Sequence, residues 1–278
     1  MEILRYAAFS PTPDGGNPAG VVLDARGIDD ATMLATAAAI GFSETAFVTP
    51  AADGHLDIRY FSPRDEVPFC GHATIATAVA YADRHGAGEL RLRTKAGPVT
   101  VATEVDSSGA TTATLVAVPP RTVGLPEADL TALLAALRWR AEDLDPALPP
   151  RVAYAGAWHP IIAASTRARL ADLDYDMAAL GRLMREKDWT TIDLVWREDA
   201  MIFHARNPFP PGGVVEDPAT GAAAAAFGGY LRELDLVPTP ATITVHQGRD
   251  MGRPGVITVT IPAAADSGIH VTGTAVQL

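Results

Sequence analysis

Two stretches of this chain consist almost entirely of alanine and other small apolar residues, and each follows a short polar segment. Together with that polar segment, the first covers 69–82 and the second 216–231. A helix that is apolar on every side has no face to offer to water, so it must be buried. Because the side chains are small, the surrounding structure must enclose it tightly. We therefore predict two buried helices, each at the centre of its own domain with strands wrapped around it.

Short runs with alternating or β-branched character supply the strands for such domains. They are expected at 4–9, 19–23, 45–48, 56–61, 90–93, 112–118, 242–246, 256–261 and 269–276. A further helix should begin after Asp29 or Asp30, which can cap it, and end at Ile40 before Gly41.

The prolines of 118–126 stop strands and discourage helix, which indicates a domain junction. A chain of 278 residues also has room for two domains. We predict an N-terminal domain at 1–118, completed by 266–278, and a C-terminal domain at 119–265. The predicted fold class is α+β, with two pseudo-symmetric domains that each wrap a barrel-like sheet around a central apolar helix. The alternative is a single α+β sandwich.

Charge and composition exclude several classes of function. The formal net charge of -11 would repel a phosphate backbone, so no nucleic-acid partner is expected. No run approaches the length of an apolar bilayer span and no leader is visible, so we expect a cytoplasmic protein without membrane association. The single cysteine, Cys70, cannot form an intrachain disulfide.

Several motifs of enzyme chemistry are absent from the sequence. It has no Gly-x-Ser-x-Gly elbow, no phosphate-binding glycine-rich loop, no His-Glu-x-x-His helix and no dinucleotide fingerprint. The seven histidines are scattered, and none stands at the local spacing typical of zinc ligands. We therefore expect no metal and no cofactor.

The starts of the two buried helices are candidate anion sites. The first N–H groups of a helix lack partners and carry positive potential, which favours a carboxylate ligand. Gly71 and Gly221 at these starts would let a ligand approach the backbone. Asp217 followed by proline fits an N-cap and first helical residue, a purely structural role. An isolated histidine at a helix start, as His72 is, is more often a hydrogen-bonded structural residue than an acid or base.

Glu44 stands in the otherwise apolar neighbourhood 41–48. A carboxyl group desolvated there would have a raised pKa, suited to proton transfer near neutrality. The alternative is a glutamate that is simply exposed beside a turn. Cys70 is either a small buried hydrophobe or, at a helix N-terminus, a reactive thiol.

Five segments together resemble the signature blocks of the PhzF-like family of phenazine biosynthesis. In family order they are GNPAGVV at 16–22, FSETAF at 42–47, VPFCGHAT at 67–74, EDPATG at 216–221 and QGRDMGRP at 247–254. The resemblance spans nearly the whole chain and implies a diaminopimelate-epimerase-like fold with the active site in the cleft between two domains. It also implies a homodimer and a cofactor-independent isomerase. The family's founding reaction converts trans-2,3-dihydro-3-hydroxyanthranilate to its keto isomer.

By this resemblance, Glu44 matches the catalytic acid/base that moves a proton on a small carboxylated substrate. His72 and Asp217 match polar residues that orient the amino and hydroxyl groups of the substrate. The substrate-binding residues that the resemblance implies are Ser43, Gly71, Gly221 and Asn17.

One position departs from the family pattern, because Ala222 stands where serine is common. The lost hydroxyl weakens the match to the founding substrate, so two other functions stay open. An amino-acid racemase or epimerase of this fold uses two facing thiols, and a chain with Cys70 alone could offer only a mixed pair of Cys70 and Asp217. The last alternative is a non-catalytic protein that binds a small molecule.

Overall fold

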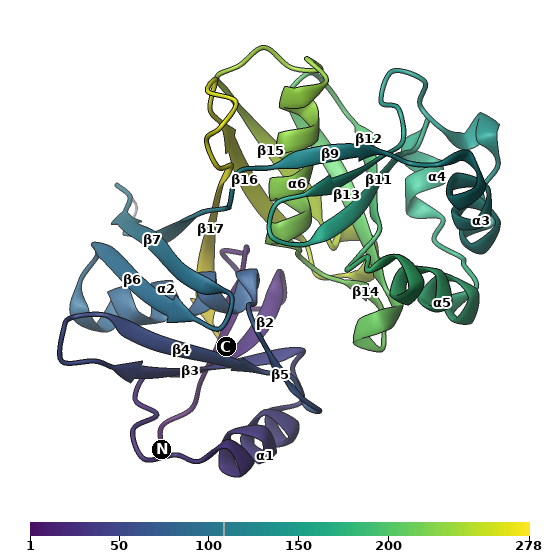
Figure 1. Cartoon of the computed structure of the whole chain (residues 1–278). Coiled ribbons are helices and arrows are strands. Elements are labelled where there is room, and N and C mark those ends of the chain that lie inside the picture. Colours follow the sequence, from purple (N-terminus) through teal and green to yellow (C-terminus); the bar gives the residue numbers. More distant parts are fainter. Residues whose placement is uncertain (108) are drawn as a thin grey trace. The chain divides into compact units, whose positions relative to one another are not determined.

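The chain divides into two compact units in the computed structural model, which describes residues 1–107 and 109–278 (Figure 1). Unit 1 comprises Met1–Val116 with Thr272–Leu278, and unit 2 comprises Ala117–Val271. No helix within these described ranges is long and apolar enough to cross a bilayer.

Unit 1 is a closed barrel of eight strands in the order β1, β2, β3, β4, β6, β7, β8 and β17, and β17 pairs again with β1. Among these neighbours, β2–β3 and β4–β6 are parallel. The strands are β1 (Leu4–Ala8), β2 (Asn17–Val22), β3 (Glu44–Pro50), β4 (Leu56–Phe61), β6 (Glu89–Thr94), β7 (Gly97–Val105), β8 (Thr111–Val116) and β17 (His270–Gln277), with the short β5 (Glu66–Val67) paired to β4.

Helix α2 (Gly71–His85) is the centre of unit 1 and packs against β1, β2, β3, β7 and β8 (Figure 1). Every residue from His72 to Ala80 is buried, which confirms the predicted all-round burial. The small side chains let the strands approach the helix closely. The Tyr60 and Thr74 hydroxyls, 2.6 Å apart, satisfy each other inside this core.

Helix α1 (Asp30–Ile40) covers the outside of the barrel over β3 and β4. The Asp29 carboxylate accepts a hydrogen bond from the Thr32 backbone N–H, and the helix ends at Gly41 with φ 74°. Both ends lie where the sequence predicts them, because the residues at each end determine by themselves where the helix begins and ends.

Unit 2 wraps strands around helix α6 (Gly221–Glu233), which packs against β9, β10, β11 and β16. Its strands are β9 (Arg121–Gly124), β10 (Arg151–Tyr154), β11 (Trp158–Ala163), β12 (Asp193–Arg197), β13 (Ile202–Phe209), β14 (Val214–Asp217), β15 (Ala241–Gln247) and β16 (Gly255–Ile261). The remaining helices are α3 (Glu127–Leu137), α4 (Arg167–Ala171), α5 (Met177–Lys187) and the 3-10 turns η1 (Ala141–Asp143), η2 (Pro210–Gly212) and η3 (Arg249–Met251).

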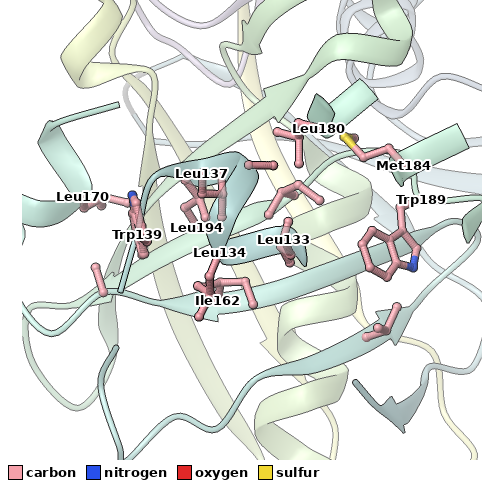
Figure 2. Packing of buried hydrophobic residues seen from close by; sticks show 14 residues of the cluster. Leu133, Leu134, Leu137, Trp139, Ile162, Leu170, Leu180, Met184, Trp189 and Leu194 are labelled. Carbon is pink, nitrogen blue, oxygen red and sulfur yellow. The ribbon is translucent and has the colours of Figure 1, made fainter. Parts of the chain in front are cut away.

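A second hydrophobic cluster joins α3 and α5 to strands β11 and β12 of unit 2. Figure 2 shows Leu133 and Leu137 of α3, Leu180 and Met184 of α5, and Leu194 of β12 in this cluster. All five are fully buried. The helices outside the sheet are therefore fixed by apolar packing of their own, independent of the central helix.

The two units repeat one chain pattern. Elements β1, β2, α1, β3, β4, β5, α2, β6, β7 of unit 1 recur as β10, β11, α5, β12, β13, β14, α6, β15, β16 of unit 2. The orientations of the paired strands also match, since β2–β3 and β4–β6 are parallel in one unit and β11–β12 and β13–β15 in the other. The predicted fold class of two pseudo-symmetric barrel-like domains is confirmed.

Asp217 is not the N-cap that the sequence suggests. It is the last residue of β14, which pairs with β13 through Asn207↔Asp217. The chain is therefore still extended at Asp217, and the N-cap of α6 is Thr220.

The proline-rich junction 118–126 contains regular structure, because it includes β9, which pairs with β10. Pairing with a distant strand overrides the local turn signals there. Strand β13 likewise continues through Pro208 to Phe209, where the turn η2 follows it.

Candidate active site

Glu44 is the first residue of β3 and lies beside Ala19 of the parallel strand β2. Its side chain is only 15% exposed. Burial raises the pKa of the Glu44 carboxyl above its ordinary value of 4.5, while hydrogen bonds from Ser43 and Cys70 oppose this rise. Glu44 is therefore the desolvated carboxyl group that the sequence suggests, not an exposed one.

His72, in the first turn of α2, lies between Glu44 and Asn17. Its Nε2 is 3.5 Å from Glu44 Oε2 and 3.4 Å from Ser43 Oγ. Its Nδ1 is 3.1 Å from the amide nitrogen of Asn17. The Cys70 sulfur, at the N-cap of α2, is 3.4 Å from the same Nδ1.

Three elements of unit 1 thus bring together residues that are far apart in the sequence. Asn17 is the first residue of β2, and Ser43 directly precedes Glu44, the first residue of β3. Cys70 is the N-cap of α2, and His72 lies in its first turn. Gly71 is the first helical residue, so the positive end of a buried helix lies at this cluster. Four predicted site residues, Asn17, Ser43, Glu44 and His72, are joined by these contacts.

In unit 2, Asp217 ends β14, and Gly221 is the first residue of the second buried helix, α6. The Thr220 hydroxyl donates to Asp217 Oδ2 over 2.6 Å. The Gln247 side chain accepts from the Thr220 backbone N–H at 2.9 Å and donates to the Asp217 backbone oxygen at 2.8 Å. Gln247, whose side chain holds this turn, is a residue that the sequence argument missed, although it opens one of the five resembling blocks.

A buried polar cluster in unit 2 is also missed by the sequence argument. The Thr191 hydroxyl donates to Asn207 over 2.7 Å, and the Asn207 amide donates to Asp193 over 3.0 Å. His159 Nδ1 lies 2.8 Å from the Thr191 hydroxyl. Burial raises the pKa of Asp193 to about 7 and lowers that of His159 to about 4.

This cluster occupies the place in unit 2 that the Glu44 cluster occupies in unit 1. Asp193 opens β12 opposite Ile161 of the parallel β11, as Glu44 opens β3 opposite Ala19 of β2. Only the register of the repeat reveals this equivalence, so no motif could have found it.

A model of the family described as "Phenazine biosynthesis-like protein", PhzC-PhzF, matches residues 6–278. The chain belongs to this family. It is 31% identical to the "Uncharacterized isomerase YddE" of Escherichia coli over 100% of this chain and 96% of that protein. It is 29% identical to the "Trans-2,3-dihydro-3-hydroxyanthranilate isomerase" of Pseudomonas aeruginosa over 96% of this chain and 93% of that protein.

Solved structures support the same assignment. The phenazine biosynthesis protein of the PhzF family from Bacillus anthracis superposes with a TM-score of 0.88 at 27% identity, covering 100% of this chain and 98% of that one. A probable proline racemase from Agrobacterium radiobacter has a TM-score of 0.68 at 12% identity, covering 99% and 90%, and shares the fold alone. This PhzF-family chain is an enzyme of the isomerase class.

The chemistry available to the PhzF-family chain at this site is proton transfer. A carboxyl group whose pKa is raised by burial accepts a proton more readily than an exposed glutamate does, and it can return that proton. The neighbouring His72 and Ser43 offer further polar atoms within 3.5 Å of each other.

Proposed function

We propose that this isomerase moves a proton on a small carboxylated substrate without a cofactor, with Glu44 as general acid and base. The observation that supports this most directly is the burial of Glu44 beside His72, with a raised carboxyl pKa. A single carboxyl group can take the proton from one carbon and deliver it to another when it lies over one face of the substrate.

His72 and Asp217 are proposed to orient the polar groups of the substrate. His72 is held by Asn17, and Asp217 by Thr220, so each can keep one orientation while the substrate binds. Ser43, Asn17 and the backbone at Gly71 and Gly221 are proposed to bind the substrate carboxylate. Helix N-termini suit this role, because their N–H groups and dipole both favour an anion.

The substrate we propose to test first is trans-2,3-dihydro-3-hydroxyanthranilate, which the name of the Pseudomonas aeruginosa relative specifies. It carries the carboxylate and the transferable proton that this site requires. Ala222 removes a hydroxyl from the α6 start, so a related cyclic or amino-acid-like carboxylate is the next choice.

The decisive experiment compares wild type with Glu44→Gln in deuterated water. Wild type should incorporate solvent deuterium into the isomerised product. Glu44→Gln should still bind the substrate, measured as a thermal shift, but lose turnover and incorporation by a factor of about 100 or more. Glu66→Gln, at a carboxylate of the same unit that pairs with Arg59 and Lys95, is the matched control and should retain activity. Deuterium incorporation at the wild-type rate in Glu44→Gln would end the assignment.

We also propose that the enzyme acts as a homodimer in the cytoplasm. The support is the resemblance to the family and the single cysteine of the sequence, Cys70, whose unoxidised thiol suits a reducing compartment. Light scattering after size-exclusion chromatography tests the dimer, and a single monomer peak at micromolar concentration would refute it.

A further inference from the structure

The two ring nitrogens of His72 face different chemical groups. The side-chain amide nitrogen of Asn17 lies 3.1 Å from Nδ1. Ser43 Oγ and Glu44 Oε2 lie 3.4 Å and 3.5 Å from Nε2. A neutral imidazole carries its proton on one nitrogen and accepts a hydrogen bond at the other. The neighbours of the ring therefore determine which nitrogen is the donor.

The contact with Asn17 makes Nδ1 the acceptor. An amide nitrogen carries two hydrogens and is a donor only, so it bonds to Nδ1 when Nδ1 is unprotonated. Asn17 is 1% exposed and His72 6%, so water does not replace this hydrogen bond. The Cys70 sulfur lies beside the ring, nearer to Nδ1 (3.4 Å) than to Nε2 (3.8 Å), and leaves the Nε2 side to Ser43 and Glu44.

The neighbours of Nε2 lead to the same assignment. The Ser43 hydroxyl donates its hydrogen bond to Glu44, so its oxygen accepts from the ring. The carboxylate oxygen of Glu44 is an acceptor as well. Glu44 also attracts a second proton to the ring, whereas the burial of His72 and the positive end of α2 oppose it. The ring is therefore neutral, with its proton on Nε2.

A proton on Nε2 gives His72 a hydrogen-bond donor beside the proposed base. Its acceptors at 3.4 Å and 3.5 Å lie beyond the ordinary range of about 2.7–3.2 Å, so a substrate oxygen at shorter distance would be the better acceptor. A donor placed there stabilises the negative charge that develops on the substrate when Glu44 removes a proton from carbon. A protonated Nε2 cannot itself accept a proton, so Glu44 remains the base.

We propose that Asn17 is a positioning residue, which holds His72 in the neutral form with its proton on Nε2. His72 then acts as a hydrogen-bond donor to a hydroxyl or carbonyl oxygen of the substrate, not as a second base. The use of this donor rests on the proposed function, whereas the position of the proton does not.

His159 in unit 2 provides the opposite case within the same chain. The Thr191 hydroxyl donates its proton to Asn207, so its oxygen accepts a hydrogen bond from His159 Nδ1. Burial lowers the pKa of His159 to about 4, so this ring is neutral at pH 8 with its proton on Nδ1. Two buried histidines of one chain are thus expected to carry their protons on different nitrogens.

The test is nitrogen NMR of the full chain with isotope-labelled histidine, at pH 8 and without substrate. Couplings between ring protons and ring nitrogens show which nitrogen is protonated. His72→Gln and His159→Gln assign the two rings among the seven histidines by the signals that each removes. Wild type should show His72 protonated on Nε2 and His159 protonated on Nδ1. A wild-type His72 ring protonated on Nδ1 would overturn the proposal.

A pair of variants tests whether Asn17 sets the position of this proton. Asn17→Asp replaces the donor by an acceptor of the same shape and should move a proton onto Nδ1 of His72. Gln277→Glu makes the same chemical change at an exposed residue of unit 1 and should leave His72 as in wild type. An unchanged His72 in folded Asn17→Asp would overturn the role of Asn17.

Kinetics separate this positioning role from direct contact with the substrate. Asn17→Ala adds no charge and should lower kcat by about 10-fold, with a smaller rise of KM. A rise of KM with unchanged kcat would mean that Asn17 acts only by contacting the substrate, and would overturn the positioning role. Proton exchange that survives in Glu44→Gln, together with the expected NMR result, would reject the proposed base and leave the assignment of the His72 proton standing.

Discussion

At the scale of single residues, Glu44 stabilises the fold less than a neutral side chain would. Its folded-state pKa is raised by burial, so the folded protein holds the carboxyl proton more tightly than the unfolded chain does. The favourable contribution of the neutral form is complete below the unfolded pKa near 4.5 and is lost as pH rises through the folded pKa. A buried acid/base residue of this kind lowers the stability of the fold, while its raised pKa makes it more reactive in proton transfer.

Glu44→Gln should therefore raise Tm at pH 8 by about 2–4 °C and change it little at pH 4. Glu66→Gln makes the same chemical change where Arg59 and Lys95 lower the carboxyl pKa, so it should lower Tm at pH 8. Thermal unfolding of both variants at both pH values checks this. If the two variants shift Tm in the same direction at pH 8, the desolvation of Glu44 is not what sets its pKa.

Asp193 and His159 should have opposite effects on stability over one pH range. Asp193 titrates at about 7 when folded, so its contribution falls as pH rises from about 4 to 7. His159 titrates at about 4 when folded, so its contribution falls as pH drops from about 6.5 to 4. Between pH 4 and 6.5 these two changes of unfolding free energy with pH therefore cancel in the wild type.

Removing either group should leave the pH dependence of the unfolding free energy that the other group causes. Asp193→Asn should lose up to about 1.4 kcal/mol of unfolding free energy per pH unit, relative to wild type, as pH falls from 6.5 to 4. His159→Gln should show the reverse slope, with stability falling as pH rises. Urea unfolding across this range measures both. Parallel profiles for wild type and the two variants would contradict the assigned shifts.

At the scale of elements, helix α6 can pack closely against its neighbours because two of its positions are glycine instead of alanine. A Cβ added at Gly229 would lie 2.3 Å from Cβ of Pro120, and one at Gly228 would lie 2.9 Å from Cγ1 of Val259. Proline cannot move aside as a flexible side chain would. Particular neighbours in unit 2 therefore require small residues at these positions of the helix.

Gly229→Ala should destabilise the protein by about 1–3 kcal/mol. The substitution gains about 1 kcal/mol of helix propensity, but the clash with Pro120 costs more. Gly88→Ala, where an added Cβ meets nothing within 4 Å, should be neutral or slightly stabilising. Chemical denaturation of the two variants gives the comparison, and a stable Gly229→Ala would show that α6 packs less tightly than described.

The elements that the sequence predicts correctly are those decided by local chemistry. Helix α1 has its cap at Asp29 and its stop at Gly41, and the burial of α2 follows from its own composition. The cap at Asp217 is wrong because Asp-Pro has the same local appearance in a strand, and only the pairing of β14 with β13 decides between them. No local signal could place Glu44 beside His72, since parallel pairing of β2 and β3 and the packing of α2 bring them together.

At the scale of the whole molecule, unit 1 is built from both ends of the chain. Strand β17 pairs with β1 in the register Tyr6↔Gln277 to Ala8↔Ala275, and it also pairs with β8. Thr114 and Thr272 contact each other through their hydroxyls at 2.7 Å. All of unit 2 is thus inserted in the sequence between β8 and β17, two neighbouring strands of one barrel.

Deleting residues 272–278 should unfold unit 1 and leave unit 2 folded. Without β17, strands β1 and β8 keep unpaired backbone groups along two open edges, and buried groups left without partners cost about 1–3 kcal/mol each. Unit 2 keeps α6, its surrounding strands and its separate α3–α5 cluster. Hydrogen exchange should then show lost protection in peptides of α2 and β3 and retained protection in those of α6 and β12. Deleting only 277–278, where both residues are exposed, should preserve protection in both units. Protected α2 peptides in the longer deletion would mean that the barrel of unit 1 does not need its closing strand.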